Sequence, residues 1–328
     1  MFEKIAIYGT GAIGGWLGAR LAAAGAHVGA VARGATLQAV RQNGLRLIEQ
    51  GTERAVKIEA SDDPAALGAQ DLVIVAVKAP AMAAVAQHIA PLLGPETTVL
   101  TAMNGVPWWF LQGFGGRAAG RTLESVDPGG AVARAIAARR VIGGVVHASC
   151  SLDAPGVVHH RMGNRLIVGE PSGEATARGR ALHRLLQKAG FDAELTPHIQ
   201  KEIWYKLWGN MTINPACALT GATADRILDD PLTRAFISRI MLEARDIGAR
   251  IGIPIAENPE DRHAVTRKLG ALKPSMLQDV EAHKPLELDA LLTAVRELGQ
   301  LTHVATPNTD ALLGLARVHA RALGLYPG

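Results

Sequence analysis

Three polar side chains recur at intervals of four residues in the second half of the chain. They are Lys206, Asn210 and Asn214. A step of four residues turns a helix by about 400°, so the three fall within roughly 80° of one another on one helix face. Such a stripe can be an ordinary solvent-facing edge. Asparagine is a poor helix former, however, and two of them in mid-helix are better explained if their amides bind polar groups in a cleft.

Further along the chain, a serine and a glutamate follow prolines that mark helix starts. Pro274 directly precedes Ser275, and Pro285 stands two residues before Glu287. A carboxylate in the first turn of a helix is favourable for the helix dipole alone, so the position of Glu287 does not by itself indicate a site. Asn104 comes at the carboxyl end of an expected strand, where ligands bind in open α/β sheets. An asparagine before a glycine also suits a turn.

A glycine-rich segment near the N-terminus matches the G-x-G-x-x-G pattern of dinucleotide-binding loops. It follows an apolar strand, opens a helix and leads to a second apolar strand. The first glycine makes the tight turn, the second lets the backbone approach a pyrophosphate, and the third lets the helix pack on the strand. The pyrophosphate then lies at the helix N-terminus, where free N–H groups favour an anion. The loop consists of Gly9, Thr10, Gly11, Ala12, Ile13 and Gly14.

The residue after the second strand distinguishes the two nicotinamide dinucleotides. Asp or Glu at that point binds the ribose 2′-hydroxyl of NAD, whereas arginine accommodates a 2′-phosphate. The chain has Arg33 there, which indicates NADP(H). Lys78 ends a later strand on the same edge of the sheet, and it is either a second phosphate contact or an ordinary solvated lysine.

The elements that must position these residues alternate between strand and helix over the first half of the chain. Expected strands are 5–8, 28–32, 72–77 and 98–102, and expected helices are 16–24, 34–43 and 80–93. This alternation predicts a doubly wound, mostly parallel sheet, that is, an α/β Rossmann domain. Further expected elements are strands at 141–146, 157–168 and 192–195, turns at 154–156 and 163–164, and a helix at 175–189.

After Thr196 and Pro197 the pattern becomes helical. Helices are expected at 199–219, 230–251, 274–283 and 285–302, with no clear strand between them. We therefore place a domain boundary here, between a dinucleotide-binding domain over 1–196 and an all-helical substrate and catalytic domain over 197–328.

Composition and charge exclude several function classes. Hydrophobic residues make up 48% and charged residues 20% of the chain, as in ordinary globular proteins. The net charge of +4 comes without a concentrated run of Lys and Arg, so no nucleic-acid partner is expected. No signal peptide or membrane span is visible, and two cysteines are too few for a disulfide framework, which leaves the cytoplasm by elimination. His159 and His160 have no metal-ligand partners at suitable spacing, so no metal is expected.

These motifs occur in an order that resembles the ketopantoate reductases, or 2-dehydropantoate 2-reductases. The matching stretches are the glycine loop, Val77–Ala79, Met103–Gly105, Lys206–Pro215 and Pro274–Asp289, and the resemblance runs from about residue 4 to about residue 315. It implies a Rossmann domain joined to an all-α domain like the C-terminal domain of 6-phosphogluconate dehydrogenase, with the active site in the cleft between them. It also implies NADPH-dependent reduction of 2-dehydropantoate to pantoate, a step of pantothenate and coenzyme A biosynthesis.

The resemblance further implies a role for each residue singled out above. Lys206 would be the general acid. The substrate-binding residues would be Asn104, Asn210, Asn214, Ser275 and Glu287, with Glu287 on a substrate hydroxyl. Cofactor binding would use the glycine loop, Asn104 near the nicotinamide, and Arg33 and Lys78 on the 2′-phosphate.

The segment after Asn104 differs from the amino-acid sequence that is usual in the family, and this leaves the exact substrate open. Gly105 is followed by Val-Pro-Trp-Trp-Phe, and Trp108 and Trp109 could narrow the pocket, act as a packing wedge or join a subunit contact. One alternative is therefore the same chemistry on a different small 2-keto acid. Another is a non-catalytic NADP-binding sensor, since a Rossmann unit alone indicates binding and not catalysis. The 231–251 region offers a route to a homodimer.

Overall fold

The structure, a computed structural model, describes residues 2–327 and divides into two compact units. Unit 1 runs up to Met103 and continues in Gly130–Ile199. Unit 2 comprises Asn104–Gly129 and the chain from Gln200 onward. The chain therefore leaves unit 1 after Met103, contributes a segment to unit 2 and returns at Gly130. The sequence pattern gives no sign of this excursion. The expected functional division into 1–196 and 197–328 stays a prediction.

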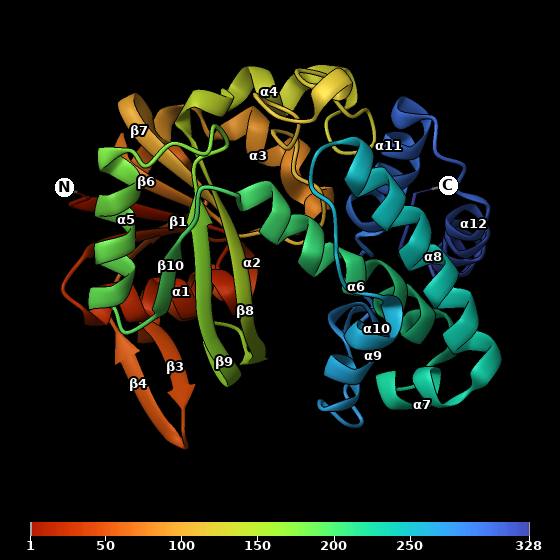
Figure 1. Ribbon diagram of the computed structural model, residues 1–328. Helices are drawn as coiled ribbons and strands as arrows, with labels where there is room; N and C mark the ends of the chain where they lie inside the picture. Colours follow the sequence, from red (N-terminus) through yellow and green to blue (C-terminus); the bar gives the residue numbers. More distant parts are fainter. Residues whose placement is uncertain (1, 328) are drawn as a thin grey trace. The chain divides into compact units, whose positions relative to one another are not determined.

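Unit 1 is built on one ten-stranded sheet (Figure 1). The strand order is β4-β3-β9-β8-β7-β6-β1-β2-β5, and β10 pairs with β9. Most neighbours are parallel, and the antiparallel pairs are β3 with β4 and β8 with β9. The strands are β1 (Lys4–Tyr8), β2 (His27–Val31), β3 (Leu45–Glu49), β4 (Thr52–Val56), β5 (Glu59–Ser61), β6 (Gln70–Val75), β7 (Leu93–Thr101), β8 (Val141–Ala154), β9 (Val157–Gly169) and β10 (Asp192–Leu195). The doubly wound, mostly parallel sheet predicted from the sequence is confirmed.

The central strands are apolar because helices cover the sheet. Ile5, Ile7, Leu72 and Ile74 are all fully buried. The helix α1 (Ala12–Ala23) packs against β1, β2, β3, β8 and β9. Its close approach depends on glycine, because a Cβ on Gly18 would lie 3.0 Å from a side-chain carbon of Ile7. The other helices of unit 1 are α2 (Gly34–Asn43), α3 (Met82–His88), α4 (Ala131–Ala135) and α5 (Ala177–Lys188).

Several local predictions for unit 1 were wrong. The turn expected at 163–164 lies inside strand β9, where Gly163 has a φ of 77° beside an irregularity in the pairing with β8. The helix expected at 80–93 is the short α3 flanked by two 3₁₀ turns, Ala79–Ala81 and Ala90–Leu92. Strands β3, β4 and β5 were not predicted. All five residues of β4 are exposed or half-buried, so that strand has no apolar pattern to recognise.

Unit 2 is helical, and none of its described residues forms a strand (Figure 1). Its α-helices are α6 (Ile199–Thr220), α7 (Ala224–Asp229), α8 (Pro231–Arg250), α9 (Pro259–Arg267), α10 (Ser275–Glu281), α11 (Ala294–Thr302) and α12 (Pro307–Ala322). The first two residues of α6 straddle the division between the units. A π-helical turn, Asp289–Thr293, leads into α11. The helix expected over 285–302 therefore begins later, and Glu287 lies just before it rather than in its first turn.

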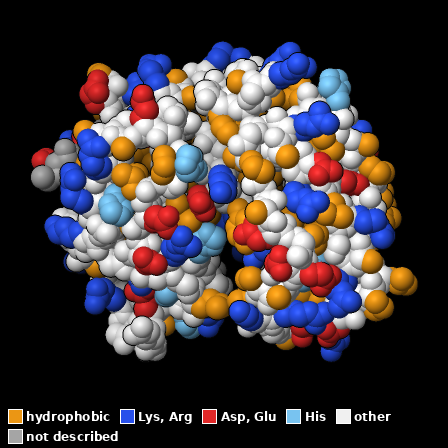
Figure 2. Space-filling view, in the orientation of Figure 1, with side chains coloured by type: hydrophobic (Ala, Val, Ile, Leu, Met, Phe, Trp, Pro, Cys, Tyr) orange, Lys and Arg blue, Asp and Glu red, His pale blue; other side chains and the backbone are white. Residues whose placement is uncertain are grey.

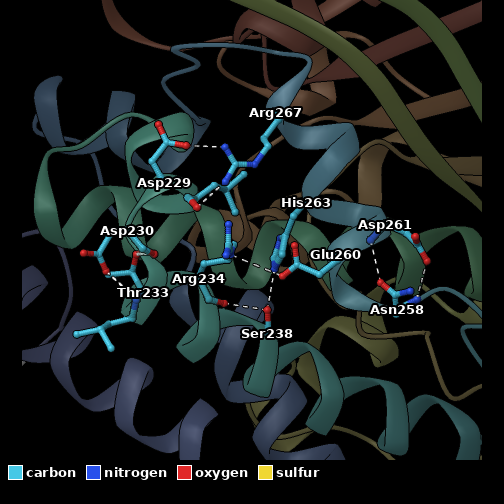
Figure 3. A network of polar contacts seen from close by, with 12 residues as sticks. Asp229, Asp230, Thr233, Arg234, Ser238, Asn258, Glu260, Asp261, His263 and Arg267 are labelled. Atoms are coloured by element: carbon cyan, nitrogen blue, oxygen red, sulfur yellow. Dashed lines mark hydrogen bonds and ion pairs between the residues drawn. The ribbon is translucent and has the colours of Figure 1, made fainter.

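Polar contacts cap the start of α8 and join this helix to α9 (Figure 3). The carboxylate of Asp230 caps α8 by accepting bonds from the backbone N–H groups of Leu232 and Thr233. On the same helix, the Ser238 hydroxyl lies 2.9 Å from Nε2 of His263, which is buried in α9. Burial lowers the pKa of His263. The contact between Ser238 and His263 therefore links α8 to α9.

Charged side chains of both signs are interspersed on the face drawn in Figure 2. Within residues 2–327, no helix is long and apolar enough to cross a membrane.

Candidate active site

The glycine loop joins β1 to α1 in the way that the motif predicts. Gly9 has a φ of 98°, which favours glycine, and a Cβ on Gly14 would lie 2.0 Å from the carbonyl oxygen of Gly9. A Cβ on Gly11 would meet nothing within 4 Å, so open space lies above the residue that should approach a pyrophosphate. Gly11 is the N-cap of α1, and no side chain caps the first N–H groups. This helix end can therefore take an anion. The helix begins at Ala12, four residues earlier than expected.

A cavity of about 320 Å³ lies beside this loop in unit 1. Arg33, the N-cap of α2, and Thr36 in its first turn line one part of it. The remaining lining residues come from the glycine loop, the ends of β1 and β2, the segment after β6, α3 and β8: Tyr8, Gly9, Thr10, Gly11, Val31, Ala32, Val77, Ala81, Ala84, Val85 and Leu152. Lys78 lies half-buried after β6 and is not among the residues that line this cavity.

Tyr8 is a cavity residue that the sequence reasoning missed. It is the last residue of β1 and its side chain is only 5% exposed. Burial raises the pKa of its phenol, and the nearby Arg33 guanidinium partly offsets this effect. In the sequence Tyr8 simply continues the apolar run of its strand. The available signal was a phenol directly before the glycine loop.

In unit 2, Lys206 and Asn104 meet directly. Nζ of Lys206 donates a hydrogen bond of 2.8 Å to Oδ1 of Asn104. Burial lowers the pKa of Lys206 from 10.5 to about 8, although the negative charge of Glu287 acts in the opposite direction. Asn104 lies beyond the end of β7 at Thr101, and it belongs to unit 2 rather than to the sheet that carries the dinucleotide loop.

The other predicted substrate residues lie around the same helix. Asn210 follows Lys206 by one turn of α6 and is half-buried. Asn214 follows by one more turn and is buried, and its Nδ2 donates to Oγ of Ser275 at 3.4 Å. Glu287 is 7% exposed and acts electrostatically on Lys206. Hydrogen bonds thus join Asn104 and Ser275 to residues of α6, and Glu287 acts on the same helix through its charge.

The segment after Asn104 is anchored within unit 2. The backbone N–H of Val106 donates to the carbonyl oxygen of Ala290 at 2.9 Å. Gly105 has a φ of 81°, and a Cβ there would lie 2.6 Å from both Cβ and the carbonyl oxygen of Ala290. Trp108 and Trp109 are 4% and 0% exposed. The two tryptophans are therefore core residues of unit 2, which fits the packing wedge among the three roles considered for them.

Comparison with known proteins identifies the family. The model described as ketopantoate reductase PanE/ApbA matches residues 5–108, and the model of its C-terminal part matches residues 198–320. A 2-dehydropantoate 2-reductase of Mesorhizobium japonicum is 47% identical, with 98% of this chain and 99% of the relative covered. The chain belongs to the ketopantoate reductase family. It is therefore an oxidoreductase by descent, and the resemblance noted in the sequence is confirmed.

Solved structures agree with the ketopantoate reductase assignment. A protein of Ralstonia solanacearum assigned to the ketopantoate reductases is 54% identical, with a TM-score of 0.96 and 99% of this chain and 100% of that chain covered. A 2-dehydropantoate 2-reductase from Geobacter metallireducens is 29% identical, with a TM-score of 0.83 and coverage of 95% and 98%. The expected combination of a Rossmann domain with a helical C-terminal domain is the fold of this family.

Proposed function

We propose that this ketopantoate reductase reduces 2-dehydropantoate to pantoate with NADPH, as a step of pantothenate and coenzyme A biosynthesis. The observation that carries the proposal is the state of Lys206. Its ammonium group is held by Asn104 at 2.8 Å, and burial brings its pKa to about 8. A group with a pKa near the working pH is suited to proton transfer.

The role of the unit 2 residues follows from the negative charge that develops on the substrate's keto oxygen during reduction. When bound, the dihydronicotinamide supplies a hydride to the keto carbon, and negative charge then develops on the keto oxygen. The Lys206 ammonium stabilises that charge and gives its proton to the oxygen. Asn104 accepts from Nζ and thereby fixes where the ammonium points. Glu287 keeps Lys206 protonated to a higher pH than burial alone would allow.

The remaining polar side chains of this group fit a small keto acid that carries a hydroxyl. Glu287 is buried and bonds the substrate hydroxyl. Asn210, Asn214 and Ser275 bond the other polar oxygens, and Ser275 already contacts Asn214. A buried polar group that matches a substrate hydroxyl discriminates strongly against analogues that lack it.

For the cofactor, we assign the glycine loop and Arg33 of unit 1. The open space above Gly11 and the uncapped start of α1 suit the pyrophosphate. Arg33 lies in the cavity at the end of β2 and suits the 2′-phosphate that distinguishes NADP from NAD. Lys78 is a further candidate for that phosphate, and Asn104 for the nicotinamide side.

A panel of 2-keto acids tests the substrate assignment. The rate of NADPH oxidation is measured for 2-dehydropantoate and for keto acids without the hydroxyl, such as 2-oxoisovalerate. We expect kcat/KM for 2-dehydropantoate to be higher by about a hundredfold or more. Faster turnover of another keto acid would instead favour the alternative substrate, and no turnover of any keto acid would favour the sensor.

The cytoplasmic location, the homodimer and the division at residues 196 and 197 also stay predictions.

A further inference from the structure

The cavity of unit 1 contains a buried phenol at the point where β1, β2 and α2 come together. Tyr8 ends β1, and it lines the cavity with Arg33 and Thr36 from the start of α2. Only 5% of Tyr8 is exposed to solvent. The phenol is therefore part of the cavity wall rather than a surface group.

The surroundings of Tyr8 favour an anionic ligand group. Arg33 is exposed at the cavity and forms no ion pair with an acidic side chain in the described part of the chain. The Arg33 side chain does not cap α2, so N–H groups of the first turn are left for a ligand. The positive end of the α2 dipole adds to the guanidinium charge. The cavity thus presents two sources of positive potential on one side.

The Tyr8 hydroxyl is itself an unsatisfied donor. It is buried, and the Arg33 guanidinium, which can only donate, acts on its oxygen, so the O–H proton itself has no acceptor among residues 2–327. Because burial raises the pKa of the phenol, the group keeps its proton at neutral pH and can donate to an anion. A buried O–H group without an acceptor is unfavourable, and a ligand oxygen that accepts from it removes the cost.

We propose that the Tyr8 hydroxyl donates a hydrogen bond to the 2′-phosphate of the cofactor's adenylyl ribose. Tyr8 then acts together with Arg33 and the N-terminus of α2, and it contributes to the preference for NADP over NAD. This inference rests on the proposed NADP-dependent function, and it adds a discriminating residue that is neither in the glycine loop nor at the end of β2.

The rival role for Tyr8 is packing alone. In that case the ring would support the adenosine part of the ligand by its face, and the hydroxyl would contribute nothing. Phenylalanine has the same ring without the hydroxyl. The substitution Tyr8→Phe therefore separates the two roles.

The test compares two ligands that differ only by the 2′-phosphate. Binding of adenosine 2′,5′-bisphosphate and of adenosine 5′-monophosphate to the full chain is measured by titration calorimetry. We expect Tyr8→Phe to weaken the bisphosphate about tenfold and to change the monophosphate less than twofold. Tyr326→Phe removes a phenol hydroxyl from unit 2, where it bonds Asp289, and should leave both ligands unchanged.

The other possible results of the titrations distinguish failure of the inference from failure of the NADP assignment. If Tyr8→Phe weakens both ligands equally or neither, the hydroxyl does not contact the 2′-phosphate and the inference is wrong, while the proposed function stands. If the unaltered protein binds the bisphosphate no more tightly than the monophosphate, the NADP assignment itself fails.

Thermal unfolding without ligand gives a second readout. Tyr8→Phe removes a buried donor that has no acceptor, and the exposed Arg33 stays hydrated without the phenol oxygen, so the apo protein should unfold at the same temperature or higher. The bisphosphate should raise the unfolding temperature of the variant less than that of the unaltered protein. A destabilised apo variant would mean that the O–H proton already has an acceptor within the protein, and it would overturn the inference.

Discussion

The amide oxygen of Asn104 accepts a 2.8 Å hydrogen bond from the ammonium group of Lys206. The two residues are 102 positions apart in sequence, and both belong to unit 2. The bond orients the ammonium without neutralising it, because an amide carries no net charge. The acid in the proposed reduction is therefore held by a partner that leaves its proton available.

The pH dependence of reduction should follow Lys206. Its pKa is lowered to about 8, and only the protonated form can supply the proton. We expect kcat/KM for keto-acid reduction to be constant at lower pH and to fall as the pH rises through about 8. Rates measured from pH 6 to pH 10 at saturating NADPH give the profile. A profile without a descending limb in this range would contradict the assignment of Lys206 as the acid.

Removing the charge of Glu287 should move that limb. The carboxylate favours the charged form of Lys206 and so raises its pKa. In Glu287→Gln the pKa of Lys206 falls further, and the descending limb shifts to lower pH. The KM should also rise, because the amide is a poorer acceptor for a substrate hydroxyl. A rise in KM with an unmoved limb would show that Glu287 binds substrate without acting on Lys206.

Arg33 should select the cofactor through its charge. We expect Arg33→Asp to weaken NADPH binding at least about tenfold, since a charge-assisted bond to the 2′-phosphate is replaced by repulsion. Binding of NADH should change far less. Arg54→Asp, at an exposed position of β4, is the matched control for the change of charge. Fluorescence titration measures the binding of both cofactors. Equal weakening of NADPH and NADH binding would argue against a 2′-phosphate contact.

Gly105 should tolerate no side chain. Its φ is 81°, and a Cβ would lie 2.6 Å from Ala290. We expect Gly105→Ala to lower the free energy of unfolding by about 2 kcal/mol or more, through strain and displacement of neighbouring backbone. Gly314→Ala is the control, because a Cβ on this exposed glycine of α12 meets nothing within 4 Å and alanine favours a helix. Denaturant unfolding in which both variants behave alike would show that the close contact has no energetic effect.

The frame of the fold was predictable because its signals are local. The glycine loop, the apolar runs of β1 and β6, and Arg33 after β2 lie within short stretches of sequence, and each has a direct structural meaning. The spacing of Lys206, Asn210 and Asn214 likewise needs only one helix, and α6 provides it.

What could not be predicted depends on contacts between distant parts of the chain. Asn104 comes just after a strand of unit 1, yet it reaches Lys206 because the following segment is anchored on Ala290. Helical conformation begins only at Leu288, so Glu287 lies outside the first turn, which no propensity rule indicates. The role of Tyr8 likewise depends on Arg33, 25 positions later in the sequence, which lines the same cavity and acts on the phenol.

The most direct test of the central claim is the turnover of 2-dehydropantoate with NADPH by the Lys206→Ala variant. We expect kcat to fall by about a hundredfold to ten-thousandfold, as for loss of a general acid, while the Kd for NADPH stays within about twofold. Lys201→Ala is the control, since Lys201 is an exposed lysine on the same helix and its removal should leave kcat unchanged. A Lys206→Ala variant that keeps the full kcat would contradict the account.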